Sequence, residues 1–278
     1  MRWSNRCCGL RRSPQLTMHP YFSLFGKEIP AYWLCVLAGA AASAVLLLLR
    51  HKRFPELQQV DITNGAALAV VGVIIGGRAL YLLTILPVII RRWSYIVENH
   101  LFEELLSNGM VFYGGLFGAI TALFVYLRKY RIDGDSFYDY IVPVFPLFHA
   151  FGRVGCFLTG CCHGIVSDRY GIAFSHSISS ENGIPYFPVQ LLGSVLEFLL
   201  FLVLILYERK HHKHGKSLRF YLFVYATGRF LIEFLRGDTV RGIWFGLSTS
   251  QWISLAVILV IIIRSLSFMK RKTAEGAD

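Results

Sequence analysis

The chain has 278 residues, of which 55% are hydrophobic and only 16% are charged, and its mean hydropathy is +0.52. A soluble domain cannot bury so much apolar surface, so this composition excludes a soluble globular protein and favours one that crosses a membrane several times. The net charge of +11 would suggest nucleic acid binding in a soluble protein, but lysine and arginine gather here in alternate connections between apolar segments. That pattern is typical of membrane topology, and we expect no nucleic acid partner.

The first residues, 1–17, are basic and carry no apolar core of the kind found in a signal peptide. Met18-His19-Pro20 then leads directly into the first apolar segment. We therefore expect residues 1–17 to be either a disordered tail or an over-extension, with Met18 as the true start.

Seven apolar segments follow, most of them close to the roughly 20 residues that a helix needs to cross a hydrocarbon core. They cover approximately residues 30–50, 64–87, 108–127, 137–151, 188–207, 218–235 and 248–267. The fourth is the shortest, and Pro143 and Pro146 predict that it is a broken helix. We predict an all-α polytopic membrane protein with about seven transmembrane helices, forming one domain over residues 18–272.

Basic residues predict the orientation of these helices. The connections near residues 50–53, 128–131 and 209–219, together with the segment 270–272, carry most of the lysine and arginine. Since such connections remain in the cytoplasm, we expect the N-terminus outside and a cytoplasmic tail over residues 273–278.

One segment, residues 149–164, differs from the apolar chain around it because it combines four glycines with Arg153, three cysteines and two histidines. A polar, glycine-broken segment beside membrane helices is tolerated only where it lines a cavity enclosed by protein or lies at the interface. The segment therefore marks the predicted active site, on the outward side of the membrane.

Charged residues within apolar segments indicate an anion site. Arg229 and Glu233 are four residues apart, which places them on one helix face. Glu233 would hold the Arg229 guanidinium toward a phosphate, although an ion pair that only locks helix packing is the alternative. Arg236 extends the same face, and Arg153 is the second phosphate candidate.

The cysteines Cys156, Cys161 and Cys162, with His149 and His163 nearby, allow three interpretations. Thiolate and imidazole are ligands that zinc prefers, but the usual pair of cysteines separated by two residues is missing. A disulfide from Cys156 to either other thiol is the second interpretation, and packing of small thiols in a tight loop is the third. We expect the protein to need no metal and no cofactor.

Several motifs resemble those of the prolipoprotein diacylglyceryl transferase family, and they occur in the same order over nearly the whole chain from Met18. They are Met18-His19-Pro20, Ile29-Pro30-Ala31-Tyr32, Gly77-Arg78-Ala79-Leu80-Tyr81, Phe112-Tyr113-Gly114-Gly115, Gly152-Arg153-Val154-Gly155, Pro188-Val189-Gln190-Leu191, Gly228-Arg229-Phe230 through Glu233, and Leu247-Ser248 to Gln251-Trp252. The resemblance implies a seven-helix enzyme of the bacterial cytoplasmic (inner) membrane. Its substrates would be phosphatidylglycerol, whose diacylglyceryl group is transferred, and the lipobox cysteine thiol of a prolipoprotein, with glycerol phosphate released.

The resemblance also implies roles for individual residues. The expected catalytic residues are Arg153, Arg229, Glu233, Tyr113 and Tyr32, and the expected substrate-binding residues are Arg153, Arg229, Gly114, Gly115, Arg236, His149, Cys156 and Cys161. Three positions depart from the family pattern, because Tyr113 replaces a histidine, Cys156 an asparagine and Cys161 a glutamate. His149 or His163 is then the more plausible proton acceptor.

Other functions remain open at this stage. A related phospholipid-dependent transferase would use the same lipid but a different acceptor. A lipid-binding or transport protein would use Arg229 and Glu233 without catalysis, although the chain lacks the inverted repeat of many transporters. A thiol redox protein would depend on the three cysteines instead.

Overall fold

Helices dominate the structure, a computed structural model that describes residues 15–17, 20–24, 27–98, 111–177, 180–210, 216–237 and 243–275. They are α1 (Ala31–Arg50), α2 (Gln59–Arg91), α3 (Trp93–Glu98), α5 (Phe112–Lys129), α6 (Gly134–Ile141), α7 (Val144–Thr159), α8 (Val189–Lys210), α9 (Lys216–Ile232) and α10 (Thr249–Glu275), with short 3-10 turns η1 (His51–Arg53) and η2 (Glu233–Leu235). Within the described residues, five helical stretches are long and apolar enough to cross a membrane: Ala31–Arg53, Gln59–Arg91, Gly134–Thr159, Val189–Arg209 and Thr249–Ser267. The prediction of a mostly helical polytopic membrane protein is confirmed.

The helices belong to two compact units, one formed by Met1–Arg50 with Tyr138–Asp278 and the other by His51–Phe137. The single membrane domain over residues 18–272 stays a prediction. The expectation for residues 1–17 lies outside the described residues, apart from Gln15–Thr17, which form the short strand β1.

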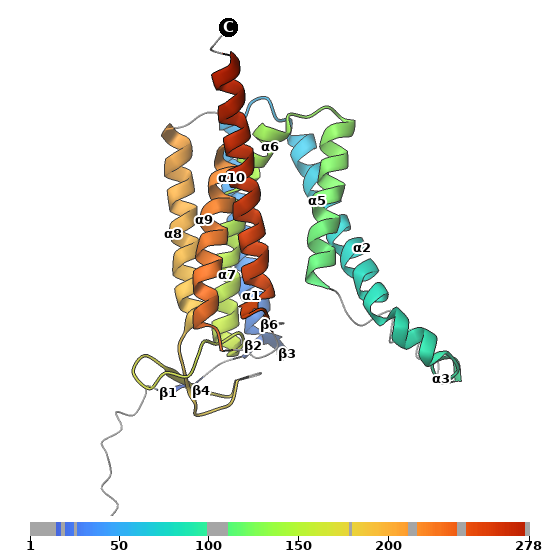
Figure 1. Ribbon diagram of the computed structural model, residues 1–278. Coiled ribbons are helices and arrows are strands. Elements are labelled where there is room, and N and C mark those ends of the chain that lie inside the picture. Colours follow the sequence, from blue (N-terminus) through green and yellow to red (C-terminus); the bar gives the residue numbers. More distant parts are fainter. Residues whose placement is uncertain are drawn as a thin grey trace, which may run out of the picture. The chain divides into compact units, whose positions relative to one another are not determined.

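In the first unit, α7 packs against both α1 and α8, while α9 packs against α8 and α10 (Figure 1). The predicted break near Pro143 is present, since α6 ends at Ile141 and α7 begins at Val144. Beyond this break α7 continues to Thr159, so Arg153 and Cys156 are helical. The expectation that the chain leaves the helix near residue 152 was wrong by about two turns.

Short strands lie at the end of this bundle where α7 and α9 end and α8 and α10 begin (Figure 1). They form three small sheets: β1 (Gln15–Thr17), β4 (Ile172–Ser175) and β5 (Pro185–Tyr186) in one, β2 (Tyr21–Leu24) with β3 (Lys27–Pro30) in another, and β6 (Ile243–Trp244) with β7 (Leu247–Ser248) in the third. The prediction of helices alone missed these strands, because two to four residues are too few to show an alternating apolar pattern. We call this end the strand end.

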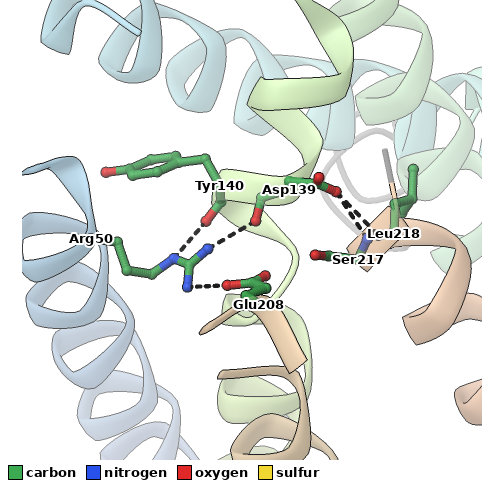
Figure 2. Close-up of polar contacts among 6 residues, drawn as sticks. All are labelled: Arg50, Asp139, Tyr140, Glu208, Ser217 and Leu218. Atoms are coloured by element: carbon green, nitrogen blue, oxygen red, sulfur yellow. Dashed lines mark hydrogen bonds and ion pairs between the residues drawn. The ribbon is translucent and has the colours of Figure 1, made fainter. Parts of the chain in front are cut away.

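A buried ion pair holds the opposite end of the same unit (Figure 2). Arg50, the last residue of α1, donates to the Glu208 carboxylate at 2.6 Å, to the Tyr140 carbonyl at 3.1 Å and to the Asp139 carbonyl at 2.9 Å. The Asp139 carboxylate in turn accepts the backbone N–H of Ser217 at the start of α9. Removing one partner of such a buried pair costs about 3–5 kcal/mol, so this cluster ties α1, α6, α8 and α9 together. From the sequence, Arg50 is only a topology signal, because its partners lie on other helices.

In the second unit, α2 and α5 pack through glycines spaced four residues apart. Gly72 and Gly76 on α2 face Gly118 and Gly114 on α5, and a Cβ added at Gly76 would overlap the Gly114 carbonyl oxygen. Small residues at this spacing let membrane helices approach closely, because no side chain separates their backbones. Large apolar side chains such as Ile75, which is 64% exposed, point away from that contact and suit a lipid environment.

We expect Gly76→Ala to lower the free energy of unfolding by about 1–3 kcal/mol, because the new methyl group must push α5 away from α2. Unfolding of the purified protein in detergent would measure the change. Gly228→Ala is the matched control, since a Cβ there meets nothing within 4 Å. Equal stability of the two variants would contradict the proposed contact.

Candidate active site

Three arginines gather at the strand end of the first unit. Arg153 lies near the end of α7, Arg229 near the end of α9, and Arg236 directly after η2. Both Arg153 and Arg236 lie close enough to Arg229 for their positive charges to repel its guanidinium. The structure thus brings Arg153 near Arg229, although the two are 76 residues apart in sequence, while their shared role at a phosphate stays a prediction.

The Arg229 guanidinium is fixed on one side only. Its Nη2 atom lies 3.0 Å from the Glu233 carboxylate, which is 1% exposed, and donates to Ser250 on α10 at 3.2 Å. Its Nη1 atom is buried and has no hydrogen-bond partner among the described residues. Leaving a buried charged donor unsatisfied is costly, so this arrangement is suited to an oxyanion that would accept from Nη1.

Small residues leave room beside these cations. A Cβ added at Gly152, next to Arg153, or at Gly228, next to Arg229, would meet no atom within 4 Å. The Arg153 side chain itself lies along Gly193 of α8, where a Cβ would be 3.6 Å from its Cδ. Space is therefore open next to Arg153 and Arg229 at these two glycines.

The thiols of Cys156, Cys161 and Cys162 form a second cluster at the same end. Their sulfur atoms all lie within 4.8 Å of one another, and none forms a disulfide. Hydrogen bonds from the Cys156 and Cys161 thiols lower the pKa of Cys162, and Arg236 and Arg153 act in the same direction. Because the charges of Arg153 and Arg236 act on Cys162, the thiol cluster lies next to these two arginines.

Backbone hydrogen bonds join the segment after the thiols to the segment that carries Arg236. Ile165 donates to Leu235 at 3.0 Å, Gly237 donates to His163 at 3.2 Å, and Gly164 donates to Phe187 at 3.0 Å. A Cβ at Gly164 would lie 2.8 Å from the Leu235 carbonyl oxygen, so only glycine permits this approach.

A histidine–glutamate pair lies farther along α7, within the bundle. The Nδ1 atom of His149 is 2.9 Å from the Glu197 carboxylate on α8, whose other oxygen is buried without a hydrogen-bond partner among the described residues. Glu197 is a residue that sequence reasoning missed. The available signal was a lone carboxylate within the apolar segment 188–207, which is a functional hypothesis by default.

Tyr32 lies at the strand end of the first unit with the arginines and thiols. Three other residues predicted for the site, Tyr113, Gly114 and Gly115, belong to the second unit. Tyr32 is in the first turn of α1, beside Gly155, and is within electrostatic range of Arg153 and all three thiols. The Tyr113 side chain lies outside the described residues. Gly114 packs against Gly76 and Gly115 against Val73, both on α2, and their predicted substrate contacts stay predictions.

Comparison with known proteins gives a family match over nearly the whole chain. The family model for prolipoprotein diacylglyceryl transferase matches residues 20–266. This range includes the whole second unit, most of the first unit, all three arginines and the thiol cluster.

Individual relatives agree with this match. A phosphatidylglycerol--prolipoprotein diacylglyceryl transferase of Clostridium tetani is 35% identical, covering 86% of this chain and 93% of the relative. A protein of Clostridium perfringens with the same name, numbered 2, is 31% identical over 91% and 96% of the two chains. A third, from Idiomarina loihiensis, is 30% identical over 87% and 90%.

The unsatisfied Arg229 donor predicts phosphate-dependent lipid binding. We expect a diacyl phospholipid to raise the melting temperature of the purified protein, while diacylglycerol, which lacks the phosphate, raises it much less. Arg229→Met should remove that difference because the guanidinium fork is lost. The control is Arg264→Met, at an exposed position of α10. An undiminished phospholipid effect in Arg229→Met would show that the lipid phosphate binds elsewhere.

Proposed function

The chain belongs to the prolipoprotein diacylglyceryl transferase family, and from this membership we propose that it transfers the diacylglyceryl group of phosphatidylglycerol to the lipobox cysteine thiol of prolipoproteins. Glycerol phosphate is the second product. One observation carries the proposal. The buried Nη1 atom of Arg229 has no hydrogen-bond partner within the described residues, and the cationic side chains of Arg153 and Arg236 lie near it.

The reaction needs a site of this kind for its leaving group. A thiolate attacks the glycerol carbon that bears the phosphate, and the carbon–oxygen bond breaks as the carbon–sulfur bond forms. Negative charge then accumulates on the departing phosphate, and fixed cationic donors stabilise that charge most in the transition state. Arg229 and Arg153 bind the phosphate in this proposal, Arg236 adds positive charge, and Glu233 keeps the Arg229 fork in position.

The remaining roles follow from proximity. Tyr32 lies within electrostatic range of the thiols and of Arg153, which supports a hydrogen bond from its hydroxyl to a substrate oxygen. The His149 ring, whose Nδ1 atom lies 2.9 Å from the Glu197 carboxylate, is the proton acceptor in this proposal. Tyr113, Gly114 and Gly115 are kept as proposed substrate residues on the family resemblance alone.

The proposed topology has seven transmembrane helices, with the N-terminus outside and the C-terminus in the cytoplasm. At the end of the first unit opposite the strand end, α8 terminates in Arg209 and Lys210, and α9 starts at Lys216. This concentration of positive charge supports a cytoplasmic location for that end. The strand end, with the arginines and thiols, would then lie at the outer face of the bacterial cytoplasmic membrane.

Transfer from labelled phosphatidylglycerol to a lipobox peptide tests the function directly. We expect Arg153→Ala and Arg229→Ala each to lower the rate by about 100-fold or more, as for loss of one charge-stabilising donor. Arg169→Ala, at an exposed position between α7 and β4, is the control and should keep the rate. Transfer to another thiol or amine but not to the peptide would indicate the same lipid site with a different acceptor.

Thiol labelling tests the orientation. In a background whose native cysteines are replaced by serine, Glu181→Cys should react with a membrane-impermeant maleimide in spheroplasts. Arg209→Cys should react only after permeabilisation. Both positions are exposed and lie toward opposite ends of the first unit. The reverse labelling pattern would invert the proposed topology.

A further inference from the structure

The thiol cluster has a geometry that the anion site does not require. Cys156 is in the last turn of α7, and Gly160 ends the helix in the left-handed region with φ +70°. Cys162 is also left-handed, with φ +55°, which is uncommon for a residue with a side chain and turns the chain back toward Cys156. As a result three sulfur atoms face one point within 4.8 Å of one another.

Several hydrogen bonds hold this turn in place. Cys161 donates its backbone N–H to the Cys156 carbonyl at 3.0 Å, and its own carbonyl accepts from the fully buried Gln190 amide at 2.7 Å. The Thr159 hydroxyl lies 3.3 Å from the Cys161 sulfur. The Ser177 hydroxyl donates to the Gly160 carbonyl at 3.0 Å. The thiols therefore converge on a preformed loop.

We propose that Cys156, Cys161 and Cys162 bind one zinc ion, and that the thiolate of the acceptor cysteine occupies its fourth coordination position. The acceptor part rests on the proposed function, whereas the metal part does not. Zinc is bound tetrahedrally by thiolates at about 2.3 Å, and a site with three protein ligands keeps one position open for a substrate. The proposal replaces the sequence-based expectation that the protein needs no metal.

The geometry distinguishes zinc from the other two interpretations of the cysteines. A disulfide would use two sulfurs and leave the third unused, although all three are mutually close. Packing of small thiols would bury them, but each of the three cysteines is only partly buried. Among the described residues, no histidine, carboxylate or further cysteine joins the group, so the fourth position is left for a ligand from outside.

Charge supports the same assignment. Three thiolates around Zn²⁺ leave a net charge of about −1, and a fourth thiolate makes it about −2. Arg236 and Arg153 are the cationic neighbours of Cys162 and would offset this charge. The same arginines adjoin Arg229, so a zinc-bound acceptor and a lipid phosphate would be neighbours.

Coordination supplies the activated nucleophile that the transfer needs. When the acceptor thiol binds zinc, it gives up its proton, because the thiolate is the ligand, and the His149 ring of the proposed function accepts that proton, directly or through water. The bound sulfur attacks the glycerol carbon, the carbon–oxygen bond breaks, and its electron pair leaves on the oxygen of glycerol phosphate. Nothing is oxidised or reduced. The thioether product is neutral and binds zinc more weakly than a thiolate, so it can be released.

Metal binding can be tested without any transfer assay. The full chain, with Cys7→Ser and Cys8→Ser to remove the other thiol pair, would be purified in detergent and loaded with Zn²⁺ or with Co²⁺ as the spectroscopic probe. We expect about one metal per chain and a thiolate-to-cobalt charge-transfer band.

Replacing any one of the three cluster cysteines should abolish both the bound metal and the band; the variants are Cys156→Ser, Cys161→Ser and Cys162→Ser. The control is Cys35→Ser, in α1 and outside the cluster, which should keep both. The thermal shift with phospholipid shows that each variant is folded.

Two results would overturn the metal site. The first concerns metal content: the wild-type protein retains no metal, or the variant with both Cys156 and Cys162 replaced still retains it. The other is a disulfide among the three cysteines in the protein as isolated, detected by mass spectrometry.

A lipobox peptide tests whether the acceptor cysteine binds at the fourth coordination position of the metal. Its cysteine should strengthen the charge-transfer band of the cobalt protein, and the same peptide with serine instead should leave the band unchanged. Chelation should lower transfer by more than about 100-fold, with recovery on adding Zn²⁺, since loss of a group that merely orients a metal ligand already costs about 10–100-fold. Transfer that persists at full rate without metal would refute the acceptor role but leave the proposed function intact. A peptide-sensitive cobalt spectrum without any transfer would uphold the site and refute the proposed function.

Discussion

The first unit depends on how a buried arginine is satisfied inside an apolar bundle. Arg50 at one end has a carboxylate and two carbonyls as acceptors, and these acceptors lie on two other helices, α6 and α8. Arg229 at the other end has Glu233 and Ser250 on one side and an unsatisfied Nη1 on the other. A buried charge whose donors are all satisfied can remain in a fold without a large penalty, whereas a buried charge with an unsatisfied donor is suited to a ligand. The same residue type thus serves structure at one end and, in the proposed function, phosphate binding at the other.

Much of this organisation follows from the sequence, for definite physical reasons. Long apolar segments predict membrane helices, two prolines predict the break before α7, and a spacing of four predicts the Arg229–Glu233 pair, because each depends only on local geometry. The motifs that resemble the family predicted the match over residues 20–266. Partners across the bundle were not predictable. Glu197 and Glu208 gave no local sign of which histidine or arginine they would meet, and the glycines of α2 and α5 became meaningful only as a facing pair.

The cysteines show where local reasoning reaches its limit. Their spacing argued against a shared ligand, since adjacent residues normally point apart. Two left-handed residues, Gly160 and Cys162, reverse the chain over a few residues and bring the sulfurs together. A backbone conformation of this kind is decided by surrounding hydrogen bonds, such as those from Gln190 and Ser177, which lie far along the chain.

The backbone bonds between residues 163–165 and 235–237 have a consequence for inhibition. These bonds hold residues 163–165, which follow the three thiols, against residues 235–237, which include Arg236. Gly164 permits this close backbone contact because it has no side chain. In the proposed zinc site and phosphate site, the distance between a thiolate bound at the zinc and an anion bound at the arginines is then fixed by the protein. A single small molecule that carries a thiol and a phosphonate on a stiff spacer of that length would gain from joining both ends, because the protein has already lost the flexibility that such binding would otherwise have to restrain.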